Sequence, residues 1–292
     1  MARTRALLVL AVLVAFAAAA AAGAASRAEG DGGVVVFERR SGSGVADLWL
    51  VRGDGSGLRR LTADGRAFAP AWSPDGRRIA FASDRGRGSG PLELWVAGAD
   101  GRGAVRLTRG LLSGRSWEAS SDPAWSPDGA RLVFTRLTVT PRGQRQELVV
   151  IGADGRGLRR LTDTPRASER APAWGPAGLI AYERDGEVWT VRPDGSAARR
   201  LLLGAGAPAW SPDGRSLAFA AADGRIAVAR ADGGGRRVVA RGDAAPSWSP
   251  DGERLVFARG GALHSVRLDG SGLRRLTRPA PLRNDAEPDW RR

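Results

Sequence analysis

The sequence predicts an all-β fold, a six-bladed β-propeller of four-stranded antiparallel blades. Three observations support this prediction. A segment with a Trp and a turn recurs about every 44 residues, each unit holds four short apolar segments, and the chain enters and leaves the pattern part-way through a unit. A fixed period of this length is typical of repeat folds whose units pack in series.

The recurring segment has its first copy in "PAWSPDGRRIAF", residues 70–81. In "SPDG" the Pro sets the first backbone angle, the Asp tolerates the second corner, and the Gly takes a position where a Cβ would clash. We therefore expect a hairpin turn here, with the Trp and the later Phe filling the space between blades. The copies place the repeated Trp at Trp72, Trp125, Trp174, Trp210, Trp248 and Trp290.

The remaining strands of a unit follow the turn in a fixed order. An alternating segment such as "RRIAF" comes first, then a second apolar run such as "LELWVAGADG", and finally "LRRLT" or a variant of it. Alternation over four to six residues indicates a strand, and Asp-Gly at the end of a run indicates a tight hairpin. Each unit thus reads as a meander of four strands.

The two ends of the repeat predict how the ring closes. The chain enters the pattern at a second strand, "VVVFERR" from Val34, and leaves it on a first strand, "EPDW". One C-terminal strand and three N-terminal strands would complete the sixth blade and hydrogen-bond the ring shut, which is expected to leave no open sheet edge. The propeller is therefore expected to span residues 33–292.

The first residues have the pattern of a secretory signal peptide. Arg3 and Arg5 precede an apolar run from Ala6 to Ala22, and "AAGAAS" offers cleavage sites after small residues. We expect a signal peptide at 1–25 and a short linker at 26–32, with export to the periplasm, the cell envelope or the exterior. A retained anchor is the alternative, but an Ala-rich run of this length is borderline for a membrane span. No other stretch could span a bilayer, so none would remain after cleavage.

Five copies of "PAWSPDG" or a close variant, with "LWVAGADGRGAVRLT" after the first, resemble the TolB-type, WD-repeat-like β-propeller family. The resemblance covers residues 33–292 and implies the propeller fold. TolB itself carries a further domain before its propeller. The segment between the expected signal peptide and Val34 has no room for one, so we expect this chain to lack that domain, and the resemblance does not carry over the partner binding associated with it.

The residue inventory argues against most catalytic chemistry. The chain has no Cys, which excludes disulfides, thiolate metal sites and cysteine nucleophiles. Its one His, His264, aligns with Trp49 and Trp95 in a column of strand positions that we expect to be packed. No nucleophile-elbow, Walker or EF-hand pattern occurs. The pectate-degrading relatives of this propeller rely on clustered histidines for a metal and are a poor match. We expect no catalytic residue, no metal and no cofactor.

The Asp-Gly turns admit a second interpretation. Their carboxylates would line one rim, where they could in principle bind Ca²⁺, although turn chemistry alone explains an Asp at these positions. We favour the turn interpretation. The aspartates concerned are Asp54, Asp75, Asp100, Asp128, Asp154, Asp194, Asp213, Asp232, Asp251 and Asp269.

The net charge of +14 would by itself suggest an anionic partner such as nucleic acid or a membrane surface. All 45 basic residues are Arg, however, and Ala, Gly and Pro are abundant. This composition is typical of genes with GC-rich codons. We favour this codon bias over an evolved anion-binding surface as the explanation of the positive charge. Export also argues against a specific nucleic-acid partner, and we expect a monomer.

One face of the predicted propeller varies between units. The first and third connections of each unit are tight turns, whereas the second connection and the link to the next unit change in length. Binding residues tend to lie on variable loops held by a rigid scaffold. We expect this face to bind a protein or an anionic cell-envelope component. The variable segments are "RGRGSGP" from Arg85, "TRGLLSGRSWEASSD" from Thr108, "RLTVTPRGQRQ" from Arg136 and "DTPRASER" from Asp163.

Five residues are candidate ligand-binding residues on this face. Arg39, Arg136, Arg184 and Arg259 lie two positions beyond the second-strand aromatic of their units and could form a partial guanidinium ring at the channel mouth, suited to carboxylate or phosphate. Solvated rim charges are the alternative. Trp117 could be a contact aromatic or a cover for the apolar pair at Leu111. The alternative function is a hydrolase- or lyase-type propeller enzyme with its active site at the channel mouth.

Overall fold

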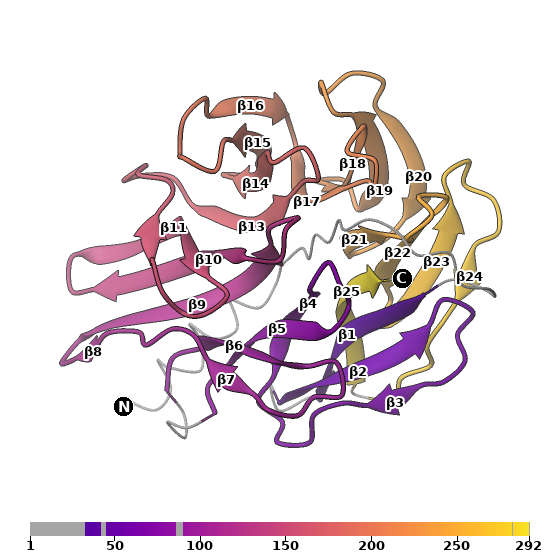
Figure 1. The fold of residues 1–292 in the computed structure, drawn as a ribbon. Helices are drawn as coiled ribbons and strands as arrows, with labels where there is room; N and C mark the ends of the chain where they lie inside the picture. Colours follow the sequence, from indigo (N-terminus) through magenta and orange to yellow (C-terminus); the bar gives the residue numbers. More distant parts are fainter. Residues whose placement is uncertain (1–32, 42–44, 86–89, 282, 292) are drawn as a thin grey trace.

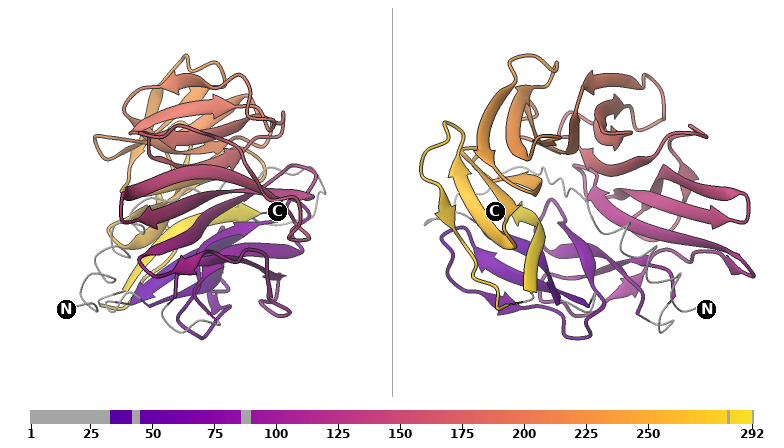
Figure 2. Two further views of the ribbon diagram at one scale, coloured as in Figure 1. Left: turned by 90° about the vertical axis from the view of Figure 1, so that its left-hand side faces the viewer. Right: turned by 180° about the vertical axis from the view of Figure 1, so that it is seen from behind.

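The computed structural model describes residues 33–41, 45–85, 90–281 and 283–291. Within these ranges, 25 β-strands form six sheets arranged as blades around a common centre (Figures 1 and 2). The expected signal peptide and linker, residues 1–32, lie outside the described residues. In the part of the chain described, no helix has the length and apolar character needed to cross a bilayer.

Five blades are each built from one continuous stretch of chain, and we name them B to F in chain order. Blade B consists of β4 (Phe68–Trp72), β5 (Arg78–Ser83), β6 (Glu93–Gly98) and β7 (Val105–Arg106). Blade C consists of β9 (Ser116–Trp125), β10 (Arg131–Thr140), β11 (Gly143–Gly152) and β12 (Arg159–Arg160), with β8 (Leu112–Ser113) added beside β9. Blade D consists of β13 (Glu169–Trp174), β14 (Ile180–Arg184), β15 (Glu187–Val191) and β16 (Arg199–Leu202).

Blade E consists of β17 (Ala205–Trp210), β18 (Ser216–Ala221), β19 (Arg225–Arg230) and β20 (Arg237–Arg241). Blade F consists of β21 (Ala244–Trp248), β22 (Arg254–Arg259), β23 (Ala262–Arg267) and β24 (Arg274–Arg275).

Blade A joins the two ends of the chain, which confirms the predicted closure. Its strands run in the order β25 (Arg283–Arg291), β1 (Val34–Ser41), β2 (Ala46–Arg52) and β3 (Arg59–Arg60). β25 pairs antiparallel with β1, from Val34 opposite Arg291 to Ser41 opposite Arg283. In Figure 1 the yellow C-terminal strand lies beside the indigo N-terminal strand. The six-bladed, all-β fold expected from the sequence is therefore the fold of the chain.

The "SPDG" turns form as their residue types predict. Gly76 has a φ of +64°, which residues with a Cβ rarely adopt. Asp75 accepts hydrogen bonds from the Ser73 hydroxyl at 2.6 Å and the Arg77 amide at 3.1 Å. The Ser73 hydroxyl holds the pKa of Asp75 below its usual value. These contacts give the turn aspartates a structural role.

The fourth strand of a blade is short and is fastened by a threonine. Blades A, B, C and F have only two paired residues in this strand. In each of these blades the Thr of the last segment accepts a hydrogen bond from a third-strand amide, as between Thr62 Oγ1 and Leu48 N at 3.0 Å. The other three pairs are Thr108 with Leu94, Thr162 with Leu148, and Thr277 with Leu263.

The core lies in the seams between neighbouring blades. Trp72 of blade B is fully buried and packs with Val36 and Leu50 of blade A and with Phe81 of its own blade. The other repeated Trp residues occupy the same place in their seams, and all six are at most 5% exposed. Truncating one of the fully buried rings should cost about 3 to 5 kcal/mol. The Trp series is therefore core, as expected.

Candidate binding face and channel mouth

Among the described residues, the strands of blade C extend farther on the variable face than those of the other blades. Its first three strands have ten residues each, whereas the corresponding strands of blades B, D, E and F have five or six. The segment from Arg136, which the sequence suggested was a loop, is a regular hairpin in which Leu137 pairs with Gln146 and Thr140 with Gly143. The segment from Thr108 also contains a hairpin, between β8 and β9. Part of the segment from Arg85, residues 86–89, lies outside the described residues.

Trp117 lies within this projection and is half-buried. It pairs with Leu112 on β8 and with Val139 on β10, and it packs against the cluster that contains Phe68 and Leu137. The indole thus forms the base of the projection. Leu111 and Leu112 stay 50% and 59% exposed, so they form an apolar tip next to it.

Arg39 does not stand free at the channel mouth. It is 8% exposed and makes a two-pronged ion pair with Asp285 of the adjacent strand, at 2.5 and 2.8 Å. Its guanidinium carbon also lies 4.6 Å from the centroid of the Trp49 ring. Both contacts are within blade A, which gives Arg39 a structural role in the closing blade.

The other three predicted arginines lie in separate blades. Arg184 of blade D stacks over Trp189 at 4.5 Å, and Arg136 of blade C lies 5.7 Å from the Phe134 centroid. Arg259 ends β22 of blade F and is exposed. Arg184 and Arg136 thus each lie over an aromatic ring of their own blade. Ligand binding by these four arginines and by Trp117 stays a prediction.

Blade B also has an arginine over rings of its own blade, but this arginine does not stand two positions beyond the second-strand aromatic. Ser83 stands where four of the other five blades have Arg, but Arg85 folds back so that its guanidinium lies 4.8 Å from the Phe81 centroid and 5.7 Å from the Trp95 centroid. Arg85 lies outside the repeated strand positions because it belongs to the loop after β5, so the repeat does not predict this contact.

The innermost strands share an unusual backbone feature around the channel. In each, the residue before the repeated Pro has a positive φ although it is not Gly, and the pairing with the second strand slips at this point. A positive φ is costly for residues with a Cβ, so it persists only where the surrounding structure imposes it. These residues are Ala69, Asp122, Ala171, Ala207, Ala245 and Glu287.

Carboxylates hold three of these strained positions across the seams. Glu38 of blade A accepts the Ala69 amide of blade B at 3.1 Å, and Glu183 of blade D accepts the Ala207 amide of blade E at 3.3 Å. Asp122 of blade C accepts the Ala171 amide of blade D. None of these three carboxylates is among the candidate site residues predicted from the sequence. The signal was the acid in "SDPAW" and "AEPDW", where other units have Ala before the Pro.

The charges at the channel are asymmetric. Ala171, Ala207 and Ala245 form an apolar cluster on the side of blades D to F, whereas Glu287 and Asp122 are buried on the other side. Burial raises the pKa of Asp122 to about 6. Burial, together with the nearby Glu38 carboxylate, raises the pKa of Glu287 well above its usual value.

Two half-buried arginines accompany these acids. Arg40 pairs with Glu38 and, at 2.9 Å, with Glu287, and Arg170 pairs with Glu183 at 2.5 Å. Neither belongs to the predicted column. The channel thus holds acids tied to arginines and backbone amides, an arrangement that fixes neighbouring blades together.

His264 occupies the packing position expected from the sequence. It is half-buried and stacks on Phe257 with a centroid separation of 6.1 Å. Burial lowers its pKa. Across the described residues, no group of three or more His, Cys, Asp or Glu side chains is placed to hold a metal ion.

A family model described as "TolB beta propeller domain" matches residues 112–292. The chain belongs to the TolB β-propeller family. Among curated relatives, "Protein TolB homolog" of Chlorobium luteolum is 33% identical over 115 residues, which cover 37% of this chain and 25% of that protein. "Tol-Pal system protein TolB" of Anaeromyxobacter dehalogenans is 37% identical over 136 residues, which cover 46% of this chain and 28% of the relative. The matches span about a quarter of the length of these relatives.

Solved TolB structures share the fold. The crystal structure of TolB from Acinetobacter baumannii superposes with a TM-score of 0.72 at 21% identity and covers 89% of this chain and 67% of that one. The superposition shows that the same fold also takes in blade B and strands β1 to β3 of blade A, which precede the residues matched by the family model.

Proposed function

We propose that this chain is an exported, non-catalytic TolB-type propeller that binds a protein component of the cell envelope through its variable face. The observation that carries the proposal is the projection of blade C. It presents Leu111 and Leu112 to solvent on blade C, whose first three strands are the longest in the part of the chain that the structure describes. Exposed apolar side chains next to an aromatic base are typical of protein-binding surfaces.

The charged groups support a binding role over a catalytic one. An enzyme would need titratable groups open to a substrate, but Asp122 and Glu287 are buried and the carboxylate of Glu38 is held by Arg40 and the Ala69 amide. The one His packs against Phe257. The acids at the channel therefore serve the fold.

The relatives support the choice of partner and compartment. Two are named TolB, and one of these names refers to a Tol-Pal system. Together with the signal-peptide pattern of residues 1–25, this favours an envelope protein as the partner and the periplasm as the compartment. An anionic envelope component is the second candidate ligand, through Arg136, Arg184 and Arg259.

The test is capture from an envelope extract with the mature chain and two matched variants. Leu111→Ser with Leu112→Ser removes the apolar tip. Leu158→Ser with Leu273→Ser makes the same change at residues that are 47% and 48% exposed near the tight turns of the opposite face. We expect a captured protein, identified by mass spectrometry, to be lost with the first variant and kept with the second. Equal capture by both variants would refute binding through the projection.

A further inference from the structure

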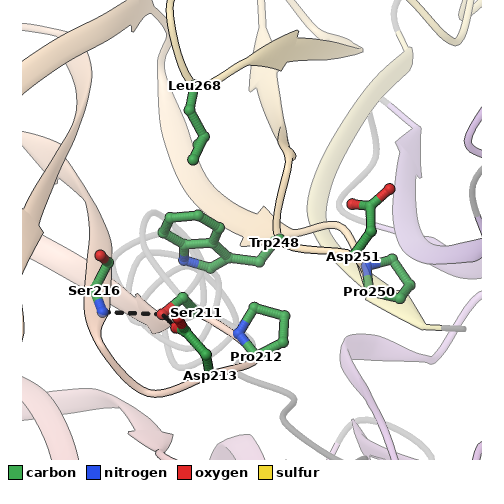
Figure 3. Close-up of a pocket in the computed structure, with 9 residues that line it drawn as sticks. Ser211, Pro212, Asp213, Ser216, Trp248, Pro250, Asp251 and Leu268 are labelled. Atoms are coloured by element: carbon green, nitrogen blue, oxygen red, sulfur yellow. Dashed lines mark hydrogen bonds between the residues drawn. The ribbon is translucent and has the colours of Figure 1, made fainter. Parts of the chain in front are cut away.

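The tight-turn face carries a pocket of about 360 Å³ in the seam between blades E and F. Its lining comes from the "SPDG" turns of both blades, Ser211–Asp213 and Pro250–Gly252, with Ser216, Trp248 and Leu268. In Figure 3 the Trp248 indole lies between Leu268 above and the Ser211–Asp213 turn below. This volume falls in the range of small ligand sites.

The same place in three other seams is filled by an arginine of the preceding blade, and two of these arginines follow an "SPDG" turn by two positions. Arg78 of blade B lies 4.6 Å over the Trp125 ring of blade C, and Arg131 of blade C lies 5.1 Å over the Trp174 ring of blade D. Residue 216 of blade E is the equivalent of Arg78 and Arg131, because it too follows its "SPDG" turn by two positions. It is a Ser, so no guanidinium comes from this position to cover Trp248.

The filled seams show which groups receive the guanidinium. Arg78 donates a hydrogen bond at 3.1 Å to the carbonyl oxygen of Gly129, the turn glycine of the next blade. In the seam between blades A and B, Arg291 stacks over Trp72 at 4.1 Å and donates to the carbonyl of Gly76, the equivalent glycine. In both of these seams one guanidinium stacks on an indole and donates a hydrogen bond to a turn carbonyl oxygen.

The seam between blades E and F keeps both receiving groups. Trp248 supplies the indole, and Gly252 is the equivalent of Gly129 and Gly76. A Cβ on Gly129 would meet Pro74 at 3.7 Å and the Arg78 guanidinium at 3.6 Å, whereas a Cβ on Gly252 would meet Pro212 at the same 3.7 Å. The turn geometry is preserved and the arginine is missing.

The turn aspartates add negative charge to the pocket. Asp213 and Asp251 each bind a turn Ser hydroxyl and a turn amide through Oδ1. Arg237 also lies close to the pocket, because its guanidinium donates a hydrogen bond to the carbonyl oxygen of Leu268, a lining residue. Arg159 makes the equivalent contact with Pro193 in the seam where Arg131 already covers Trp174. Arg237 therefore leaves room for a guanidinium over Trp248.

We propose that the pocket between blades E and F is a receptor site for an arginine side chain of a partner protein. The guanidinium would stack on Trp248, donate to the Gly252 carbonyl and lie near Asp213, as Arg78 does beside Trp125, Gly129 and Asp75. Cation–π stacking and a charge-favoured hydrogen bond to a fixed acceptor both select Arg over neutral side chains. The site is independent of the variable face.

The first test uses blocked arginine, Nα-acetyl-arginine methylamide, with NMR detection of the Trp248 indole N–H. We expect a saturable shift of this resonance, assigned with Trp248→Phe, and no such shift with the matching citrulline compound, which is similar in shape but uncharged. Ser216→Arg should fill the pocket from within and abolish the shift. Ser196→Arg adds the same charge to an exposed turn of blade D and should leave the shift intact.

A reverse variant keeps the proposal testable whatever the stability of Ser216→Arg. Arg131→Ser removes the arginine from Trp174 and should create a second saturable site, seen at the Trp174 indole N–H. A peptide with one Arg between Gly residues should bind at least as well as the blocked amino acid if the natural ligand is a protein segment, and weaker binding by the peptide would refute a protein source. An equal response to citrulline, or an undiminished shift in folded Ser216→Arg, would overturn the site itself.

Discussion

The innermost strands of blades A and E solve the same structural problem with different residues. β17 reads "AGAPAW" and β25 reads "DAEPDW" over its last residues before Arg291, so Ala205, Ala207 and Ala209 correspond to Asp285, Glu287 and Asp289. β17 continues directly into its own blade. β25 has to find strands from the other end of the chain.

Each acid of β25 contacts a group that only correct closure supplies. Asp285 pairs with Arg39 and Glu287 with Arg40, both on β1. Asp289 accepts the Trp72 amide of blade B at 2.6 Å and the Ser247 hydroxyl of blade F at 3.3 Å. A register error of one residue would bury these carboxyl groups without partners. The closing strand thus uses polar contacts for specificity where the continuous strand uses Ala for packing.

Removing residues 284–292, and with them most of β25, should lower the stability of the chain more than any of the substitutions below. The deletion takes away the strand that pairs with β1, together with Trp290, and opens the ring. We expect loss of the cooperative thermal transition or a severely lowered Tm, measured by circular dichroism. A melt like that of the full chain would show that the ring does not depend on β25.

The Arg39–Asp285 pair offers a sharper test, because blade E has Ala221 opposite Ala205 at the same two positions. Arg39→Ala alone leaves Asp285 buried without its partner and should cost about 3 to 5 kcal/mol. Arg39→Ala with Asp285→Ala copies blade E and should cost less than the single change. Urea denaturation would measure both free energies of unfolding. A double variant less stable than the single one would contradict the specificity argument.

Asp289 should make closure depend on pH. Burial raises its pKa from its usual value of 3.8 to about 7, so the folded chain keeps a proton that the unfolded chain releases between these values. The free energy of unfolding should therefore fall as pH rises from about 4 to about 7, by up to about 4 kcal/mol from this group. Asp289→Asn should make the decline shallower, measured as Tm against pH, and the remaining decline comes from Asp122 and Glu287, whose pKa values burial also raises.

A control for this pH dependence comes from a turn aspartate. The pKa of Asp75 is lowered by the Ser73 hydroxyl, so its contribution is lost only as pH falls below about 4. Asp75→Asn should leave the slope between pH 5 and pH 7 unchanged. If Asp289→Asn also leaves that slope unchanged, Asp289 does not control the stability of closure.

The smallest effect on stability is expected for the arginines outside the closing blade. Replacing Arg136 or Arg259 by Gln should change the free energy of unfolding by less than about 1 kcal/mol each, because Arg136 lies over a ring and Arg259 is exposed. Arg184→Gln should cost more than either, because Arg184 lies opposite the buried Glu169 and acts on its charge. Binding of an anionic envelope component should weaken if the predicted column is a site. Arg39 has to be left intact in this experiment.

The sequence predicted the blades, their turns and the closure because these features repeat, and a repeated Trp or Asp-Gly has the same local cause in every unit. It misjudged the hairpin of blade C, since the exposed strands of residues 136–147 alternate too weakly to stand out from a loop. The acids at the channel and the pocket at Trp248 depend on residues from two blades. The effect of Ser216 on the pocket depends on Trp248, which is 32 residues away in the chain, so it could not be predicted from the repeat alone.

The short outer strands bear on what this chain does at high concentration. Ring closure pairs every inner strand, but six outer strands remain with one edge toward solvent. In blades A, C, D and F these strands begin with two arginines, at Arg59, Arg159, Arg199 and Arg274. Short, positively charged edges repel one another, so two molecules cannot readily extend each other's sheets. Part of the Arg excess thus works against aggregation, and added salt should weaken that protection.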